Sequence, residues 1–451
     1  MFVLPRFTAK NIHKFQKLMV ATMPQVINGK SLLLSPPEEV KGMTELDREK
    51  FRKTVSFPSI TIPKKLIGKV IGLKAIKNAT IDKLNKIKPI SDGKLPDEKL
   101  ILFNPTTITD NLKTEICDTI NNVVGIKPEF GSTDLELTYD NWDVKRCIKA
   151  VLPDDLEFSG YSQVGHIAHL NLREELLPYK KVLGEILLDK VSWAKTVVNK
   201  TDSIATEFRS FDMELLAGKD EFVTTMSEQG LTYKLDFKKV FWNSRLGTEH
   251  GRIVQKLDSN SVVFDIFAGV GPFALPAAKK GVLKVFANDK NPNSTFYMEE
   301  NVKLNHIKKE SIEIFTLDAT DFITQIIGPN LISCASTSTK PICFHSIMNL
   351  PAIAVEFLYN FRGLLSSSEI TLEKLKSHKF IVHCHMFVKA NADVPQQWYS
   401  NEAIRLIREK LKLWHLEMDE IYNVRKVAGR KEMYCVTFML PWEYLLESYS
   451  K

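Results

Sequence analysis

Residues 262–273 read VVFDIFAGVGPF, and this pattern indicates how the C-terminal half of the chain is folded. Its first six residues are apolar except for Asp265, which predicts a buried strand, and a helix is predicted to follow over 274–280. The two glycines between them let the backbone approach a ligand closely. The stretch does not match a dinucleotide fingerprint, which requires a third glycine where Ala274 stands. It does not match a P-loop either, because Gly-Lys-Ser/Thr is absent. A plain strand-to-helix turn is the alternative explanation of this stretch taken alone.

Two strands predicted further along, at 285–289 and 314–318, also end in acids. Asp289 closes the first of them, and a carboxylate in that place accepts the hydroxyls of a ribose. Asp318, or Asp321 in the turn beyond, is placed to meet the amine of an adenine. Each acid taken singly is also explained as a solvated strand end. The glycine turn, the ribose-side acid and the adenine-side acid, in this order, predict a nucleoside site without a pyrophosphate cradle. S-adenosyl-L-methionine has a ribose and an adenine but no phosphate, so it fits such a site.

Strands and helices alternate from about residue 233 to the C-terminus, which predicts a largely parallel sheet covered on both faces. Residues 151–232 indicate a small α+β module, and residues 45–150 mix short strands with charged turns. The Ser/Thr-rich stretch 333–339 is expected to be a solvated loop. The strands and the helix expected in the two upstream modules cover residues 100–103, 135–139, 167–172, 180–187, 211–216 and 223–226.

The composition is that of a folded globular protein. Of the 451 residues, 44% are hydrophobic and 25% are charged, which excludes a disordered chain. No stretch approaches the ~20 uninterrupted apolar residues of a membrane span, so we expect no membrane partner. The net charge of +7 is compatible with an anionic partner. The six cysteines form no C-x-x-C pair, and His383-Cys384-His385 lies in a predicted buried strand, so we expect reduced thiols and no metal site.

The N-terminal segment is basic and amphipathic. Residues 1–37 contain five lysines and arginines and no acid, and Lys10, Lys14 and Lys17 share one helical face. This composition is typical of a mitochondrial presequence, and a solvated basic arm is the alternative. Met23 lies inside the segment as a possible second start. We therefore expect the protein in the mitochondrial matrix and also in the cytoplasm and nucleus.

Five separated motifs resemble the tRNA (guanine-37 N1)-methyltransferase family of eukaryotes and archaea. The resemblance extends from about residue 45 to the end and implies a class I (Rossmann-like) S-adenosylmethionine-dependent methyltransferase domain, preceded by smaller α+β tRNA-binding domains. It also implies methylation of N1 of guanosine 37, beside the tRNA anticodon, which supports reading-frame maintenance and wybutosine precursor formation. The motifs are VGHIAHLNL at 164–172, VFWNSRLGTEH at 240–250, DIFAGVGPF at 265–273, ANDKNP at 287–292 and NLP at 349–351.

The resemblance implies four parts of the chain. These are a basic extension at 1–44, a tRNA-binding domain at 45–150, a small α+β domain at 151–232 that contributes to the active site, and the methyltransferase domain at 233–451. The domain at 45–150 is implied to touch the outer corner of tRNA. We expect a monomer.

The reaction requires a base near guanine N1 and a donor near O6, because loss of the N1 proton moves negative charge onto O6. The resemblance assigns the base to Glu249, for which a surface ion pair with Arg245 is the alternative. It assigns O6 stabilisation to Arg209, which is otherwise a solvated surface arginine. Asn349 is implied to aim its amide at the guanine edge, and a Pro-terminated strand turn is the alternative there.

The remaining site residues also come from the resemblance. Phe241 is implied to stack on the flipped-out base, although the family often has tyrosine there and the adjacent Trp242 makes a core role a serious rival. Arg245 and Arg252 are expected to contact phosphates, as is a second basic group, Arg425, Lys426, Arg430 and Lys431, unless these side chains are merely solvated. The residues expected to bind the cofactor are Asp265, Phe267, Gly269, Gly271, Asp289, Asp318, Asn349 and His250.

Three other functions are kept open. An aminocarboxypropyltransferase of wybutosine synthesis uses the same cofactor on tRNA but should lack the Asn-Leu-Pro turn at 349–351. A non-catalytic tRNA-binding protein should have lost acids and glycines that this chain retains. A protein glutamine or DNA adenine methyltransferase would prefer Asn-Pro-Pro-aromatic at that turn.

Overall fold

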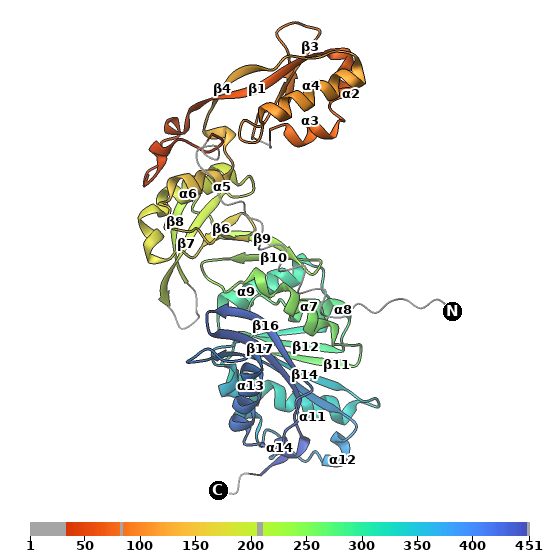
Figure 1. Ribbon diagram of the computed structural model, residues 1–451. Coiled ribbons are helices and arrows are strands. Elements are labelled where there is room, and N and C mark those ends of the chain that lie inside the picture. The colour runs from red at the N-terminus through yellow and green to blue at the C-terminus, as the bar shows by residue number, and fades with distance from the viewer. Residues whose placement is uncertain (1–32, 82–83, 205–210, 449–451) are drawn as a thin grey trace, which may run out of the picture. The chain divides into compact units, whose positions relative to one another are not determined.

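The computed structural model describes residues 33–81, 84–204 and 211–448 (Figure 1). Most of the basic N-terminal segment, for which a presequence is expected, lies outside these residues. No helix in the described part of the chain is long and apolar enough to cross a membrane.

The chain forms two compact units. The first comprises residues 1–159 and 173–192, and the second comprises the rest of the chain. The middle domain predicted at 151–232 is divided between them, because helix α6 (Lys180–Lys190) belongs to the first unit while the strands on either side of it in sequence belong to the second.

The first unit contains a four-stranded antiparallel sheet in the order β2-β3-β1-β4. Ile60 and Ile62 of β1 and Ile101 of β3 are fully or almost fully buried and pack against helix α4, which is capped by Thr109 and ended by Gly125 in the left-handed conformation. The elements are β1 (Lys53–Pro63), α2 (Ile67–Val70), α3 (Lys74–Ala79), β2 (Ile90–Asp92), β3 (Glu98–Leu102), α4 (Asp110–Val124), β4 (Gly131–Leu137) and α5 (Val144–Val151).

The second unit begins with a small sheet in the order β5-β6-β7-β8 and a separate hairpin of β9 and β10. Strands β6 and β7 are parallel, and the other neighbours in this sheet are antiparallel. The strands are β5 (Ser162–Val164), β6 (Ile167–Leu170), β7 (Thr196–Ile204), β8 (Phe211–Gly218), β9 (Val223–Glu228) and β10 (Leu231–Asp236).

A seven-stranded sheet forms the centre of the second unit, in the order β13-β12-β11-β14-β15-β17-β16. The first five strands in this order are parallel, and β17 is antiparallel to both β15 and β16. The strands are β11 (Ser261–Asp265), β12 (Lys284–Asn288), β13 (Ile312–Phe315), β14 (Cys343–Met348), β15 (Lys379–Lys389), β16 (Glu420–Ala428) and β17 (Lys431–Met439).

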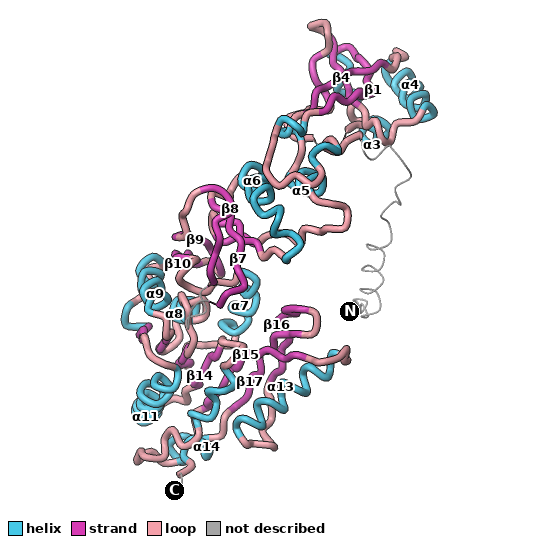
Figure 2. The backbone as a smooth tube through the Cα atoms, turned by 90° about the vertical axis from the view of Figure 1, so that its left-hand side faces the viewer, coloured by secondary structure: helices cyan, strands magenta, loops and turns pink. Residues whose placement is uncertain are grey.

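Helices cover both faces of this sheet (Figures 1 and 2). Successive residues of a strand point to opposite faces, so Val263 of β11 lies in the core that includes residues of α7, α8 and α9, while Val262 and Phe264 lie in the opposite core, which includes residues of α11 and α13. All five residues of β11 are buried, as a central parallel strand requires. The helices are α7 (Gly247–Gln255), α8 (Ala274–Lys280), α9 (Pro292–Leu304), α10 (Ala319–Asp321), α11 (Gly328–Thr337), α12 (Leu372–Leu375), α13 (Gln396–Leu411) and α14 (Trp442–Leu446).

The predicted alternation of strands and helices from residue 233 onward is confirmed, and so is the helix predicted at 274–280. The loop predicted at 333–339 is wrong, because helix α11 continues to Thr337. Leu331 and Ala335, one helical turn apart, are buried against the sheet, and this packing holds in a helix a stretch whose Ser and Thr residues are weak helix formers.

Candidate functional site

The carboxyl ends of β11, β12 and β14 lie side by side in the parallel sheet and supply the polar groups of the candidate site. The loop after β11 turns at Gly269 and Gly271, both of which have positive φ, 56° and 96°. A Cβ at Gly271 would lie 2.1 Å from Leu275 Cδ1, and the φ of 96° strains any residue other than glycine at this position. A Cβ at Gly269 would meet no atom within 4 Å, which leaves open space beside the loop.

Asp265 and Asp289 are positioned differently although both follow parallel strands. Asp289 accepts hydrogen bonds from the backbone N–H of Gly269 and of Asn291, each at 2.9 Å, and so fixes the glycine turn. Burial raises the pKa of Asp289. Asp265 is fully buried. The backbone N–H groups of Phe267 and Ala274 approach its carboxylate, and no side chain among the described residues donates to it. Burial, and then the charge of Asp289, raises the pKa of Asp265 well above its usual value.

Asn288, which the sequence analysis did not select, connects three loops of this edge. Its side-chain amide donates to the carbonyl oxygens of Ile266 and Leu317, at 3.1 and 3.0 Å, and its Oδ1 accepts from the N–H of Leu317 at 2.9 Å. The side chain is almost fully buried. The only sequence signal was its place directly before Asp289, at the end of an apolar strand.

Asn349 follows β14, in the turn that faces the glycine loop across the strand ends. Its Oδ1 is buried and has no hydrogen-bond partner among the described residues. The turn is held by Phe387, whose N–H donates to the Pro351 carbonyl oxygen at 2.8 Å. A buried amide oxygen without a partner costs free energy unless a ligand supplies a donor, so this atom indicates a binding site.

Helix α7 presents the next residues of the site. Gly247 and Gly251 lie one helical turn apart, and the turn of the β9–β10 hairpin packs against them: a Cβ at Gly251 would come within 2.6 Å of Gln229 Nε2. Gln229 also donates to the Gly247 carbonyl oxygen at 2.8 Å. This close packing fixes the orientation of the helix face that carries Glu249 and His250.

His250 is buried at the start of α7. Its Nδ1 lies 2.6 Å from Glu228 Oε1, and its ring meets the edge of Phe273 with the centroids 4.7 Å apart. Its Nε2 is buried and has no partner among the described residues. Because Nδ1 is directed at the Glu228 carboxylate, Nε2 is the ring nitrogen left for a ligand.

Glu249 is almost fully buried and accepts three short hydrogen bonds. Arg252 donates from Nε to Oε2 and from Nη2 to Oε1, and His385 Nε2 donates to Oε1, each at 2.7 Å. Burial alone would raise the pKa of Glu249, but the hydrogen bonds from Arg252 and His385 lower it to about 2. The surface ion pair with Arg245 that the sequence offered as an alternative is absent from the ion pairs of the described residues.

Arg252, for which a phosphate contact is predicted, is held by protein groups on both sides. Its Nη1 also pairs with Glu420, and its guanidinium lies 4.1 Å from the centroid of the Tyr422 ring. Arg245 makes one long contact, from Nη2 to Ser162 Oγ at 3.5 Å. Of the two arginines, Arg245 is therefore the more available for a phosphate.

The sequence left open whether this aromatic pair packs in the core or stacks on a base, and Phe241 and Trp242 differ in exposure. Trp242 is buried with its ring centroid 5.3 Å from that of Tyr233, whereas Phe241 is 48% exposed. Phe241 is thus available for stacking on a base, and that role stays a prediction.

Two further predicted cofactor residues lie at the rim of the site. Phe267 is partly buried, with its ring edge-on to Phe357 at 5.5 Å between centroids. Asp318 caps α10 by accepting from the N–H of Thr320 at 3.0 Å, and it pairs with Lys290 at 3.2 Å. The backbone hydrogen bond from Thr320 is the main cause that lowers the pKa of Asp318.

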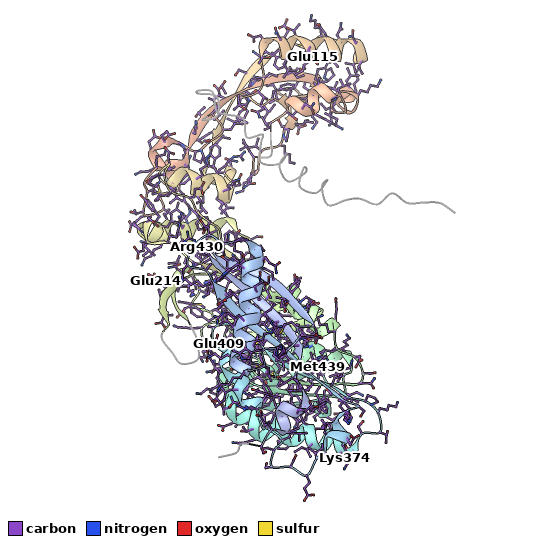
Figure 3. The ribbon with its side chains drawn as sticks, turned by 60° about the horizontal axis from the view of Figure 1, so that its bottom comes forward. Glu115, Glu214, Lys374, Glu409, Arg430 and Met439 are labelled. Atoms are coloured by element: carbon purple, nitrogen blue, oxygen red, sulfur yellow. The ribbon has the colours of Figure 1, made fainter. Side chains whose placement is uncertain are left out.

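Arg209 lies outside the described residues, so its predicted contact with O6 stays a prediction. The second basic group surrounds the turn between β16 and β17. Arg430, labelled in Figure 3, pairs with Asp393 at 2.8 Å, and the Lys431 ammonium lies 4.1 Å from the centroid of the Phe387 ring. Contact of this hairpin with RNA also stays a prediction.

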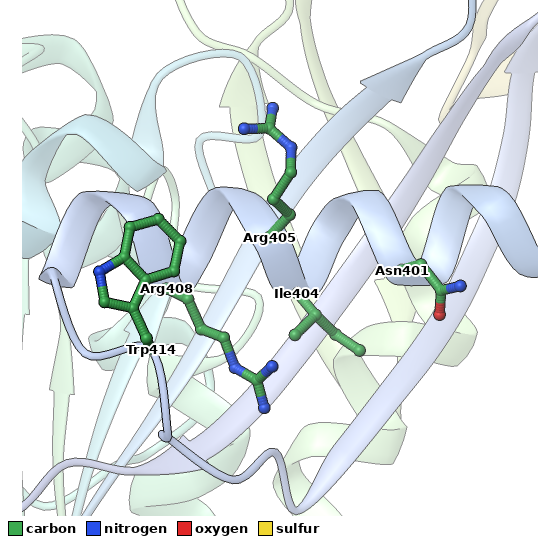
Figure 4. Close-up of a pocket in the computed structure, with 5 residues that line it drawn as sticks. All are labelled: Asn401, Ile404, Arg405, Arg408 and Trp414. Carbon is green, nitrogen blue, oxygen red and sulfur yellow. The ribbon is translucent and has the colours of Figure 1, made fainter.

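A hollow of about 260 Å³ on the outer side of α13 is not part of this site (Figure 4). Helix α13 covers the sheet face opposite to that covered by α7 and α8. Arg405 in the hollow is paired with Glu402 and Glu409. The residues that line the hollow are Asn401, Ile404, Arg405, Arg408 and Trp414.

One group of side chains has the donor atoms of a metal site. Atoms of Glu249, His385 and Cys435 lie within 4.8 Å of one another. Arg252, however, binds both oxygens of Glu249, and a cation would have to displace this guanidinium or lie against it. We assign no metal to these residues.

The doubly wound sheet and the polar groups at its strand ends define the class of protein: a class I S-adenosylmethionine-dependent methyltransferase. Such a donor has a ribose, an adenine and an amino acid end, and the buried unpartnered atoms of Asn349 and His250 suit a ligand with several hydrogen-bonding groups.

Comparisons with known proteins give the family. Residues 224–390 match the TRM5/TYW2 methyltransferase domain, and residues 144–221 match the TYW2 N-terminal domain. The tRNA (guanine(37)-N(1))-methyltransferase of Caenorhabditis elegans is 40% identical, over 92% of this chain and 91% of its own length. The enzyme of the same name from Homo sapiens is 36% identical, over 97% of this chain and 84% of its own length. The chain therefore belongs to the tRNA (guanine-37 N1)-methyltransferase family.

Solved structures agree with this fold. The complex of aTrm5 with tRNALeu superposes with a TM-score of 0.59 at 23% identity, over 85% of this chain and all of that one. Trm5b from Pyrococcus abyssi gives a TM-score of 0.55 at 22% identity, over 85% and 98% of the two chains.

Proposed function

We propose that this protein transfers a methyl group from S-adenosyl-L-methionine to N1 of guanosine 37 in tRNA. The observation that carries the proposal is the match, at 36–40% identity over nearly the whole chain, to enzymes named for this reaction. The geometry of the strand ends supports it, because it leaves buried polar atoms without partners where such a donor would lie.

When bound, the donor supplies an activated methyl group on a sulfonium, so the protein mainly has to position the acceptor and accept its proton. Asp289 is placed for the ribose, since it stands at the end of the second strand in the sheet order from β11 and also fixes the glycine turn. The unpartnered atoms of Asn349 and His250 would take the other polar groups of the donor or of the guanine edge.

Glu249 is the proposed base for the N1 proton. A carboxylate has about four acceptor positions, and Arg252 and His385 occupy three of those on Glu249. One position on Oε2 is left for the N1–H of guanine. Phe241 would stack on the base, and Arg209 would stabilise the charge that develops on O6.

The proposal is tested with purified protein, S-adenosylmethionine and two tRNA transcripts that differ only in guanosine or adenosine at position 37. Mass spectrometry of the digested nucleosides should detect N1-methylguanosine from the first transcript and no methylated product from the second. Equal methylation of both transcripts would contradict the substrate assignment.

The match of residues 144–221 to the TYW2 N-terminal domain favours the aminocarboxypropyltransferase as the second candidate function. The same measurement separates the two, because an aminocarboxypropyl group and a methyl group give nucleosides of different mass. The Asn-Leu-Pro turn at 349–351 favours methyl transfer.

Import into mitochondria is proposed separately, from the basic composition of residues 1–37. A fluorescent fusion of residues 1–40 should accumulate in mitochondria. A diffuse cytosolic signal would contradict import directed by this segment.

A further inference from the structure

His385 is bound to the proposed base although 136 residues separate them in the sequence. It lies in the middle of β15, is fully buried, and places Nε2 2.7 Å from Glu249 Oε1. Its ring is further confined by Phe273, with centroids 5.8 Å apart, and by Cys435, its directly opposite residue on β17. The orientation of the imidazole is therefore fixed by three different elements.

The charges around this pair favour an ionised contact. Burial alone would lower the pKa of His385, but Cys435 and Glu249 raise it to about 10. Other titratable groups near the pair are Arg252 on α7, Lys256 directly after α7, Glu420 on β16 and His383 on β15. Arg252 is shared between Glu249 and Glu420, so its position depends on two carboxylates, whereas the described structure gives His385 one carboxylate partner, Glu249.

We propose that His385 is a positioning residue for methyl transfer, which fixes the orientation of the Glu249 carboxylate and leaves one lone pair of Oε2 for the N1 proton of guanine. The proposal rests on the proposed function and adds a residue to it. Arg252 spans both oxygens and His385 fixes Oε1 from the sheet side, so together they determine the plane of the carboxylate. Without His385 the carboxylate keeps its charge partner but loses the contact that fixes its rotation.

His383 provides a matched control, because it is buried on the same strand two residues away. Its Nε2 lies 3.1 Å from His345 Nδ1 and its Nδ1 lies 2.9 Å from Thr437 Oγ1, so it touches neither Glu249 nor Arg252 in the described hydrogen bonds. A general loss of packing in the sheet should affect variants of both histidines, whereas a loss of positioning should affect only His385→Asn.

The test compares three variants, His385→Asn, His385→Gln and His383→Gln, in single-turnover methylation of the guanosine-37 transcript at saturating donor and tRNA. Glutamine places an amide N–H near the position of imidazole Nε2, and asparagine is too short to reach Glu249. We expect His385→Asn to lower the rate about ten- to hundredfold, because a misplaced catalytic group costs that much. His385→Gln and His383→Gln should stay within about threefold of the wild type, since both keep Glu249 bonded.

The dissociation constants of S-adenosylhomocysteine and tRNA should change less than about threefold in all three variants, which separates positioning from loss of binding. Equal rates in His385→Asn and His385→Gln would overturn the proposal, and so would an equal loss in His385→Asn and His383→Gln. A wild-type protein that leaves guanosine 37 unmodified would instead contradict the proposed function.

Discussion

Asp265 and Glu249 are both buried carboxylates of the candidate site, but their surroundings are opposite. Asp265 ends a central strand and has backbone N–H groups beside it but no side-chain partner among the described residues, so burial and the charge of Asp289 raise its pKa. Glu249 lies on a helix and accepts three hydrogen bonds from Arg252 and His385, so its pKa is lowered despite burial. The strand ends thus leave polar groups for a ligand to satisfy, whereas the helix holds a carboxylate whose charge the protein already satisfies.

This difference separates binding from chemistry. A group without partners gains most from a ligand that supplies them, which suits the cofactor edge. A base must be unprotonated and within hydrogen-bond reach of the proton that it accepts, and the contacts of Glu249 keep it unprotonated and fixed in orientation. Changes at the strand ends should therefore affect affinity, and changes around Glu249 should affect rate.

The largest effect is expected from Glu249→Gln. Removal of the base should lower the single-turnover rate by about 10²–10⁴-fold, with tRNA affinity nearly intact. The matched control is Glu420→Gln, which removes the other carboxylate partner of Arg252 and should cost less than about fivefold. Rapid-quench methylation assays measure both. Equal rates for Glu249→Gln and the wild type would remove Glu249 from the base role.

A smaller effect, on affinity, is expected from Asp289→Ala. The substitution removes the acceptor that fixes the Gly269 N–H and the proposed ribose contact, so the dissociation constant of S-adenosylhomocysteine should rise about ten- to hundredfold. Asp318→Asn should raise it less than about fivefold, because Asp318 is partly exposed and already paired with Lys290. Isothermal titration calorimetry measures both constants. A larger loss of affinity for S-adenosylhomocysteine in Asp318→Asn than in Asp289→Ala would contradict the ribose contact proposed for Asp289.

The smallest effects are opposite pH dependences of stability. The raised pKa of Asp265 means that the folded protein keeps a proton that the unfolded chain releases, so stability falls as the pH rises above the ordinary value of 3.8. Asp265→Asn should therefore be more stable than the wild type at pH 7.5, by about 1–3 kcal/mol, and this gain should shrink toward pH 4.

Glu249 should behave in the opposite way, because its pKa is lowered from 4.5 to about 2. Its stabilisation is present above pH 4.5 and is lost as the pH falls toward 2, so the destabilisation caused by Glu249→Gln should be constant above pH 5 and smaller at pH 4. Urea unfolding at several pH values measures both variants. If the change in the free energy of unfolding depended on pH in the same way in both variants, the opposite pKa shifts of Asp265 and Glu249 would be contradicted.

The sequence predicted the strands, turn and helix of this site better than the contacts between its side chains. The strand 262–267, the glycine turn and the helix after it follow from local patterns, because hydrophobic period and turn residues act over short distances. The helix at 333–337 was missed because Leu331 and Ala335 are held by burial against the sheet, which overrides the weak propensity of Ser and Thr.

The partners of Glu249 could not be predicted for a similar reason. Both Arg245 and Arg252 lie within one helical turn of Glu249, so the helix period allows either. The buried side of α7 selects Arg252, and His385 comes from a strand 136 residues away. The hydrogen bonds by which Asn288 connects three loops likewise depend on strand order. The order places the loops that contain Ile266 and Leu317 beside Asn288, although they are distant in the sequence.

A crystal structure of the protein with S-adenosylhomocysteine and a guanosine-37 tRNA would test the account most directly. We predict that the ribose lies within hydrogen-bond distance of Asp289, that the guanine edge meets Asn349, and that Glu249 Oε2 faces N1 while Oε1 keeps its bond to His385. A nucleoside bound away from the ends of β11 and β12, or a guanine N1 that faces a group other than Glu249, would contradict it.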